Sequence, residues 1–323
     1  MLVYGAKHKE LNVRGKSRSG GAFVALSDYI LENDGAVYGC LMQDTVTAIH
    51  ERAVTKEERD KFCGSKYIQS VVTCDIYSKI EYDLKNSKKV LFSGTPCQVK
   101  SMKQYLKIKK VNTQNLFLVD IACHGVPSPL IWNEYLKYLE NRFHEKAIQV
   151  DFRNKEIFGW AAHYETIMFT EFTIASPLFR ELFYRHYILR PSCYNCKCKS
   201  VPYESDITLA DFWGIDNLDA NFNDNKGVSL LLINTEKGER VFNIIKDSLL
   251  YKEFLIEQVL QDPLIKSSSL PENREQFWED FQQNGIYYCL TKYANYSWKK
   301  RILDYFPYKL AKALKKEQII RRF

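Results

Sequence analysis

Two consecutive strand–turn–helix units constrain the fold of this 323-residue chain more than any other feature. The first unit joins a short strand at 89–92 to a helix at 96–106, and the second joins a strand at 116–122 to a helix that begins at 129. Such units pair their strands in parallel and place their turns side by side at one edge of the sheet. The sequence therefore predicts an α/β fold, with a mixed, largely parallel sheet and helices on both faces.

The turn of the first unit carries both a helix start and a cysteine. Thr95 fits the N-cap position, Pro96 fits the first helical position, and Gln98 completes a capping box. Cys97 then falls in the first helical turn, where the helix dipole favours a thiolate over a thiol. A small buried cysteine is the alternative interpretation.

A cysteine-rich segment follows later in the chain. Cys193 and Cys196 form a C-x2-C hook, a spacing that lets two thiolates turn onto one metal ion or cluster. Three basic residues surround the hook, and nearby positive charge favours the thiolate form. Cys123 directly follows the second strand, as Cys97 follows the first turn, so both are expected at the same edge of the sheet. We therefore group Cys97 and Cys123 with the hook as one candidate ligand set.

The remaining thiols and one histidine have less specific surroundings. His124, next to Cys123, is either a ligand or proton donor or, in the more common role, a hydrogen-bonded turn residue. Four cysteines in less distinctive positions are predicted to be ordinary buried thiols: Cys40, Cys63, Cys74 and Cys289.

A basic stretch at 14–21 contains serines and glycines and precedes a helical pattern. A turn of this kind that enters a helix offers backbone N–H groups and the positive end of the helix dipole to an anion. A phosphate cradle, as for a flavin nucleotide, is therefore one interpretation, and a plain helix cap on a basic loop is the other. The candidate cradle residues are Ser17, Ser19, Gly20 and Gly21.

A loop at 153–160 combines basic and aromatic side chains, among them Arg153 and Trp160. It is our candidate for a substrate face that brackets a planar ring, and a tight turn is the alternative. Strands are expected on either side of this loop, at 149–153 and 166–170, and a helix is expected over 271–284. Beyond residue 250 the composition changes, which predicts a domain at 1–250 and a helical C-terminal extension at 251–323. The basic helix expected at 307–323 is interpreted as a solvated surface helix, or else as one that binds an anionic membrane or an acidic partner.

Composition excludes several classes of protein. The longest apolar runs are far shorter than a membrane span, and the N-terminus has no apolar signal core. We therefore expect a cytoplasmic protein, in which nine cysteines indicate thiolate chemistry or buried thiols rather than disulfides. The net charge of +7 suits an acidic partner or an anionic cofactor, although so small an excess is usually a solvated surface. No nucleic-acid partner is predicted, and the oligomeric state stays open.

Five sequence blocks follow one another at 17–23, 64–70, 94–98, 123–128 and 206–214. Taken in this order, they resemble the coenzyme F420 hydrogenase/dehydrogenase beta-subunit family. The resemblance runs from about residue 3 to 235, and five ordered blocks are more specific than any one of them. It implies an FAD-binding α/β protein with a 4Fe-4S cluster, which passes electrons between the cluster, the flavin and a substrate or redox partner.

The resemblance also implies roles for particular residues. One 4Fe-4S cluster would be held by Cys97, Cys123, Cys193 and Cys196, since four thiolates are the usual complement. The pyrophosphate of FAD would meet the 17–21 turn at the helix N-terminus. The flavin ring or its ribityl chain would be approached by Lys66, Tyr67, Thr95, Pro96 and Gln98. No catalytic residue is assigned.

Two departures from the family pattern affect these expectations. Many relatives carry an N-terminal ferredoxin-like domain, and this chain begins where that domain would end. We therefore expect that it lacks those relay clusters, obtains electrons from a separate ferredoxin or other redox protein, or is a truncated product. Cys198 is an extra thiol, which leaves the fourth cluster ligand open between Cys97 and Cys198. Relatives with similar tails resemble proteins of bacterial surface-polysaccharide loci, where coenzyme F420 itself need not be the substrate.

Two alternatives to an active oxidoreductase remain. Structural zinc on Cys193, Cys196, Cys198 and one distant cysteine would make the chain a non-enzymatic, zinc-stapled binding protein. A vestigial member of the family would keep the fold and the flavin pocket without turnover. Iron, sulfide and zinc analysis separates the zinc protein from the redox protein.

Overall fold

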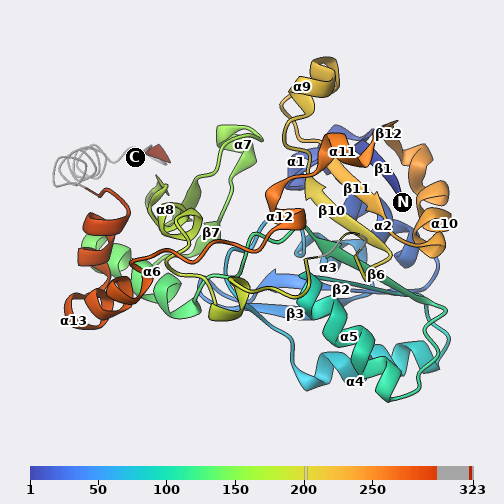
Figure 1. The fold of residues 1–323 in the computed structure, drawn as a ribbon, viewed down its shortest axis with the longest axis horizontal. Coiled ribbons are helices and arrows are strands. Elements are labelled where there is room, and N and C mark those ends of the chain that lie inside the picture. The colour runs from blue at the N-terminus through green and yellow to red at the C-terminus, as the bar shows by residue number, and fades with distance from the viewer. Residues whose placement is uncertain (200, 202, 297–319, 322–323) are drawn as a thin grey trace.

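A nine-stranded mixed sheet forms the larger part of the molecule (Figure 1). The computed structural model describes residues 1–199, 201, 203–296 and 320–321. Across the sheet the strands are β12 (Leu249–Glu253), β1 (Leu2–His8), β11 (Ser229–Ile233), β10 (Ile207–Asp211), β6 (Leu116–Ile121), β5 (Val90–Gly94), β2 (Ala36–Met42), β3 (Ala48–Ala53) and β4 (Ser70–Val71).

Five of these strands run in the same direction. β10, β6, β5 and β2 are neighbours that pair in parallel. β1 shares their direction, because β11 lies between β1 and β10 and is antiparallel to both. The carboxyl ends of all five strands therefore meet at one edge of the sheet, which we call the carboxyl edge. Ligand sites of open α/β sheets form at such an edge.

Helices cover both faces of the large sheet, as predicted. One face packs against α2 (Ala22–Leu31) and α10 (Glu236–Ile245), and the other against α4 (Cys74–Lys85) and α5 (Pro96–Ile108). The two-residue period of the strands explains this division. On β5, Leu91 joins the core beneath α2 and α10, whereas Phe92 joins the core beneath α4 and α5.

A second, smaller sheet has a hydrophobic core of its own. Its strands, in order, are β13 (Ile320–Arg321), β9 (Thr173–Ser176), β8 (Glu165–Met168) and β7 (Gln149–Asp151). Helices α6 (Pro129–Phe143), α8 (Leu178–Tyr184) and α13 (Arg274–Tyr293) contribute residues to the same core, on the left of Figure 1. The strands expected at 149–153 and 166–170 are present, but they belong to this second sheet rather than to the large one.

The remaining helices are short. They are α1 (Leu11–Lys16), α3 (Lys56–Asp60), α7 (Lys155–Phe158), α9 (Ile215–Asp219), α11 (Ile256–Val259) and α12 (Asp262–Ile265), with 3-10 turns at Pro191–Cys193, Ala220–Phe222 and Lys246–Ser248. Among the described residues, no helix is long and apolar enough to cross a membrane.

Several boundaries differ from the sequence expectations. The helix expected over 271–284 continues as α13 to Tyr293, and Gly285 interrupts it with a positive φ of 75°. The basic helix expected at 307–323 lies outside the described residues except for Ile320 and Arg321, which form β13 and are therefore not helical. Residue 250, the expected domain boundary, lies within β12, and the division into two domains stays a prediction.

Gly20 lies where the 17–21 turn passes closest to the large sheet. A Cβ atom at Gly20 would lie 2.1 Å from the Ala6 carbonyl oxygen and 2.6 Å from the Ser229 backbone nitrogen. We expect Gly20→Ala to lower the free energy of unfolding by about 1–3 kcal/mol, because rigid backbone must move. Gly15→Ala is the matched control: no atom lies within 4 Å of its Cβ, so this helical change should stabilise by roughly 0.5–1 kcal/mol. Urea unfolding of both variants tests the pair, and equal effects would contradict the expectation.

Candidate functional site

Two of the loops that carry predicted site residues, those after β5 and β6, leave the carboxyl edge of the large sheet. Within it, β5 and β6 are parallel neighbours, with Gly94 of β5 opposite Asp120 of β6. The turn that contains Cys97 therefore lies beside the loop that contains Cys123. This placement confirms the expectation that two consecutive strand–turn–helix units present their turns together.

The loop after β6 is hydrogen-bonded to the segment that enters the cysteine hook. Ser128 donates its backbone N–H to the Ile188 carbonyl over 2.8 Å, and Arg190 donates its own to the Val126 carbonyl over 2.8 Å. Val126 in turn donates its N–H to the Cys193 sulfur over 3.4 Å. The backbone thus holds the loop of Cys123 against the first cysteine of the hook.

The thiols of three separate loops lie within electrostatic reach of one another. Burial raises the pKa of Cys123 to about 12, and the Cys97 and Cys193 thiols act in the same direction. Burial also raises the pKa of Cys193, with smaller contributions from Cys196 and Cys97. Burial also raises the pKa of Cys198, and the Cys196 and Cys97 thiols contribute to the same rise. These pairwise influences connect the five cysteines, which we call the thiol group.

The thiol group provides the sulfur ligands that an iron–sulfur cluster requires, although burial raises the pKa of Cys123 and Cys193. Against the effect of burial, Lys199 lowers the pKa of Cys123, and this favours the thiolate that a metal requires. Within the described part of the chain, no group of three or more His, Cys, Asp or Glu side chains could hold a metal ion. The four proposed cluster ligands therefore do not form a site for a single metal ion. The same holds for Cys193, Cys196 and Cys198, three of the ligands of the zinc alternative.

The other four cysteines lie outside the thiol group, and one expectation about them is wrong. Cys289 is buried, and Cys40 and Cys63 are partly buried, but Cys74 is exposed. Cys74 is the first residue of α4, where the chain is still at the surface, so it does not share the burial of the apolar positions farther along that helix.

The predicted phosphate cradle is engaged in internal hydrogen bonds. Ser17 donates its hydroxyl to the Val13 carbonyl, and Ser19 donates its own to the Val228 carbonyl. The Gly20 N–H donates to the Ser229 hydroxyl over 2.9 Å. Gly21 is the N-cap of α2, with a positive φ of 89°. These bonds fix the turn at the N-terminus of α2, and phosphate binding there stays a prediction.

Lys66 and Tyr67 lie in different environments. The Lys66 ammonium donates to the carbonyls of Phe62 and Cys63 over 2.8 and 2.7 Å, just after α3. Tyr67 packs against the His163 ring, with ring centres 4.8 Å apart, and accepts a 3.4 Å hydrogen bond from Arg153. Tyr67 therefore contacts two residues that line the pocket described below, His163 and Arg153, whereas the Lys66 ammonium binds backbone carbonyls of its own loop.

Thr95, Pro96 and Gln98 shape the turn that carries Cys97. Gln98 accepts a hydrogen bond from the Thr95 N–H over 2.9 Å, and its amide donates to the Ser70 hydroxyl over 2.9 Å. Pro96 is buried at the first position of α5, as predicted. The Thr95 hydroxyl lies 3.1 Å from the Cys97 sulfur. The capping box is thus confirmed, and a role of these residues toward a flavin stays a prediction.

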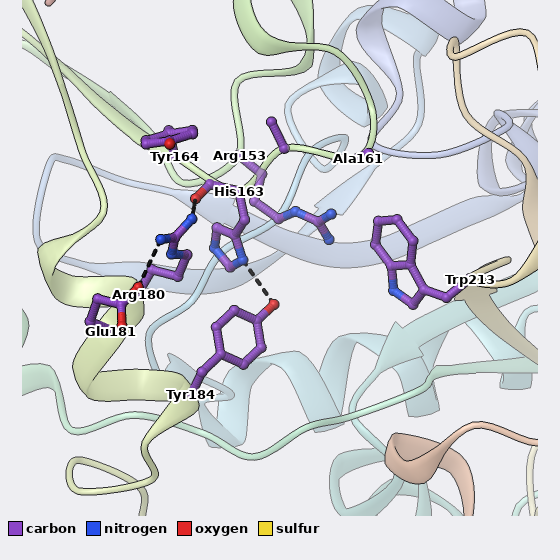
Figure 2. A pocket seen from close by; sticks show the side chains of 9 residues that line it. Arg153, Ala161, His163, Tyr164, Arg180, Glu181, Tyr184 and Trp213 are labelled. Atoms are coloured by element: carbon purple, nitrogen blue, oxygen red, sulfur yellow. Dashed lines mark hydrogen bonds and ion pairs between the residues drawn. The ribbon is translucent and has the colours of Figure 1, made fainter. Parts of the chain in front are cut away.

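A pocket of about 480 Å³ opens between the two sheets' loops (Figure 2). It contains three aromatic rings, two alanines and four ionisable side chains. Figure 2 shows the Arg153 guanidinium between the rings of His163 and Trp213. The lining residues are Arg153, Ala161, Ala162, His163, Tyr164, Arg180, Glu181, Tyr184 and Trp213.

Asp211, at the end of β10, organises one side of this pocket. Its carboxylate accepts a 2.7 Å hydrogen bond from Arg153 and a 3.0 Å hydrogen bond from the Trp160 indole N–H. The Trp160 ring stacks on Trp213, with centres 4.9 Å apart and planes at 12°. The predicted basic-aromatic loop therefore does contribute to a pocket, although Trp160 itself is buried and Trp213 faces the pocket instead.

Sequence reasoning did not identify most of the pocket residues, among them His163, Arg180 and Tyr184. His163 precedes β8, and Arg180 and Tyr184 belong to α8, so all three come from the second sheet and its helices. His163 and Tyr184 share a 2.8 Å hydrogen bond, and Arg180 donates to the His163 carbonyl over 2.7 Å. No local motif marks these residues, because only the packing of the second sheet brings them to the large sheet.

Two buried histidines predict how stability depends on pH. Burial lowers the pKa of His50 to about 4 and that of His163 to about 2, from an ordinary value of 6.5. Each therefore contributes stability that is complete above about pH 6.5 and is lost as the pH falls toward its folded-state pKa. We expect the contribution of each histidine to the free energy of unfolding to fall between pH 7 and 5, by up to about 1.4 kcal/mol per pH unit. Asp120 and Glu165, whose pKa values burial raises to about 6 and about 8, act in the opposite direction, so the contribution of His50 is read from the difference between the wild-type chain and a variant.

Urea unfolding at the two pH values measures this effect. His50→Gln should make the fall shallower, since one titrating group is removed, whereas His144→Gln, at the exposed end of α6, should leave it unchanged. A pH response that is the same in the wild-type chain and in His50→Gln would contradict the assignment.

Comparison with known proteins agrees with this architecture. A search of curated proteins gives no match. A solved structure from the F420-reducing [NiFe] hydrogenase complex of Methanosarcina barkeri is similar in fold, with a TM-score of 0.54, 17% identity, and coverage of 88% of this chain and 89% of that chain. A family model that describes the C terminus of the coenzyme F420 hydrogenase/dehydrogenase beta subunit matches residues 87–257, which is more than half of the sequence and includes Cys97, Cys123 and the hook. The chain therefore belongs to the coenzyme F420 hydrogenase/dehydrogenase beta-subunit family.

Proposed function

We propose that this protein is a flavin-dependent oxidoreductase subunit that holds one 4Fe-4S cluster. Membership of the family supports a redox role of the hydrogenase/dehydrogenase type. The finer assignment, with FAD and the cluster as cofactors, rests on the arrangement of the thiols and on the loops at the carboxyl edge. The oxidised or reduced substrate is a small molecule, and the electron partner is a ferredoxin or similar redox protein of the cytoplasm.

The observation that carries this proposal is the convergence of thiols from three loops. The loop of Cys123 is hydrogen-bonded to the hook through Val126 and Cys193, and Cys97 influences the pKa of Cys123. Sulfur ligands from separated loops are typical of iron–sulfur proteins. Cys97, Cys123, Cys193 and Cys196 would hold the cluster, and Cys198 is the substitute for Cys97 if only one of the two binds.

The carboxyl edge also offers a place for a flavin. The N-terminus of the ten-residue helix α2 follows the 17–21 turn, and such a terminus favours a pyrophosphate. When bound, a flavin exchanges hydride or electrons, and an iron–sulfur cluster exchanges single electrons. The protein's own residues position these groups: the Gln98 capping box fixes the turn of Cys97, and Asp211 fixes Arg153 beside the pocket.

Anaerobic quantification of iron, sulfide and flavin on the full chain tests the proposal. We expect about four irons and four sulfides per chain, together with one flavin. A colourless protein that contains one zinc ion and no iron would overturn the redox assignment and favour the zinc-stapled alternative. Protein that binds iron and sulfide but no flavin, even after incubation with FAD, would overturn the flavin part alone.

A further inference from the structure

We infer that the pocket lined by Arg153, Arg180 and Trp213 binds a small molecule whose flat ring bears one carboxylate. This inference rests on the proposed function in one respect, because it names the substrate class for the face that the 153–160 loop helps to form. The binding itself needs neither flavin nor iron. It can therefore be tested separately.

Arg153 supplies the recognition. Its side chain is almost fully buried, and one terminal nitrogen is bound to Asp211 over 2.7 Å. Its Nε atom is buried and has no hydrogen-bond partner among the described residues. A buried N–H group without a partner is costly, and native proteins rarely leave one. A carboxylate accepts hydrogen bonds from guanidinium N–H groups in fixed geometry, so a ligand of this kind would satisfy the group.

The charges around the pocket match one negative charge. Among the described residues that line the pocket, two arginines face one carboxylate, Glu181, which is paired with Arg180 over 2.8 Å. Behind the lining, Asp211 contacts Arg153 and Arg18, and Asp151 also acts on Arg18. The lining itself therefore has one more positive charge than negative charges. After burial, the arginines at 153, 180 and 18 are the next causes that lower the pKa of His163, which is the response expected in a positive field. A phosphomonoester carries about −1.5 to −2 near neutral pH, so a carboxylate is the closer match.

The shape and the surface of the pocket favour a flat ring. Tyr184 and Trp213 remain 45% and 41% exposed, so part of each ring is open to a ligand, although Trp160 stacks on Trp213 and the Arg153 guanidinium lies over it. Ala161 and Ala162 are the aliphatic lining residues within the described part of the chain, and their small side chains occupy little of the pocket. The volume of about 480 Å³ lies within the range of small-molecule sites. Aromatic side chains bind planar rings by stacking or by edge contacts.

Benzoate and benzamide are the paired probes, because they share a ring and differ in charge. Equilibrium dialysis and tryptophan fluorescence titration of the full-length protein should show benzoate binding at least about ten-fold more tightly than benzamide, as expected for a charge-assisted hydrogen bond. Inorganic phosphate, the third probe, should bind more weakly than benzoate. Equal affinity for benzoate and benzamide, or tighter binding of phosphate, would overturn the inference.

Three variants locate the binding. Arg153→Gln should lose about ten-fold in benzoate affinity while benzamide binding is unchanged. Because Arg153 is buried and this variant can lose its fold, Ala161→Trp provides a second route: it keeps every charge, fills the pocket and should weaken both ring probes. Arg240→Gln, an exposed change of the same charge on α10, should leave all affinities unchanged. Wild-type benzoate affinity in Ala161→Trp would place the binding elsewhere. Benzoate binding in protein without iron or flavin would separate this inference from a failure of the proposed function.

Discussion

Cys123→Ser is expected to abolish iron and sulfide binding in protein purified without oxygen. Cys123 comes from the loop between β6 and α6, and its pKa is influenced by thiols of both other loops, Cys97 and Cys193. Serine is nearly the same size but provides no thiolate, so a shared cluster would lose one of its four thiolate ligands. Iron and sulfide analysis, together with the visible absorbance of the cluster, measures the loss.

Cys74→Ser provides the matched control. Cys74 is an exposed free cysteine at the start of α4, so its substitution should leave the iron content unchanged. Cys97→Ser and Cys198→Ser then decide which of these two thiols is the fourth ligand, because only one of the two variants should lose the cluster. Full iron content in Cys123→Ser would show that the thiol group holds no shared cluster.

Trp132→Ala is expected to lower the free energy of unfolding by about 3–5 kcal/mol. Trp132 lies on α6, is fully buried in the core of the second sheet, and packs against Phe152 and Phe179. Its indole N–H also donates to the Thr45 carbonyl over 2.8 Å, in the hairpin between β2 and β3. The substitution therefore removes a large core side chain and a hydrogen bond between the two sheets' regions.

Leu130→Ala, two residues earlier on the same helix, is the control. Leu130 is 50% exposed, and exposed positions away from special features change stability by about 0.5 kcal/mol or less. Urea unfolding measures both variants. If Trp132→Ala changed stability as little as Leu130→Ala, α6 would not anchor the second sheet as described.

Local sequence patterns were sufficient to predict the central strands of the large sheet and the helices that follow them. The capping box at Thr95 and Gln98 and the proline at the start of α6 correctly marked the helices after β5 and β6, because these signals act within a few residues. The parallel pairing of β5 with β6 then follows from the connection between them. This is why the neighbourhood of Cys97 and Cys123 could be expected before the structure was known.

Long-range pairing was not predictable in the same way. β1 was not predicted as a strand, although it completes the set of five strands that end at the carboxyl edge. The second sheet was not anticipated either, since its strands are short and its core is completed by helices distant in the sequence, α6, α8 and α13. Consequently Arg153 was predicted to contribute to a substrate face, whereas its neighbours His163 and Tyr184 were not.

Loops that carry candidate site residues lie at one end of five strands that run in the same direction. The sheet and these loops are therefore under different evolutionary constraints. Side chains between the sheet and its helices must preserve packing, whereas the loops beyond the strand ends are free to diverge. A solved structure with 17% sequence identity to this chain has a similar fold, and proteins with a similar fold need not act on the same substrate.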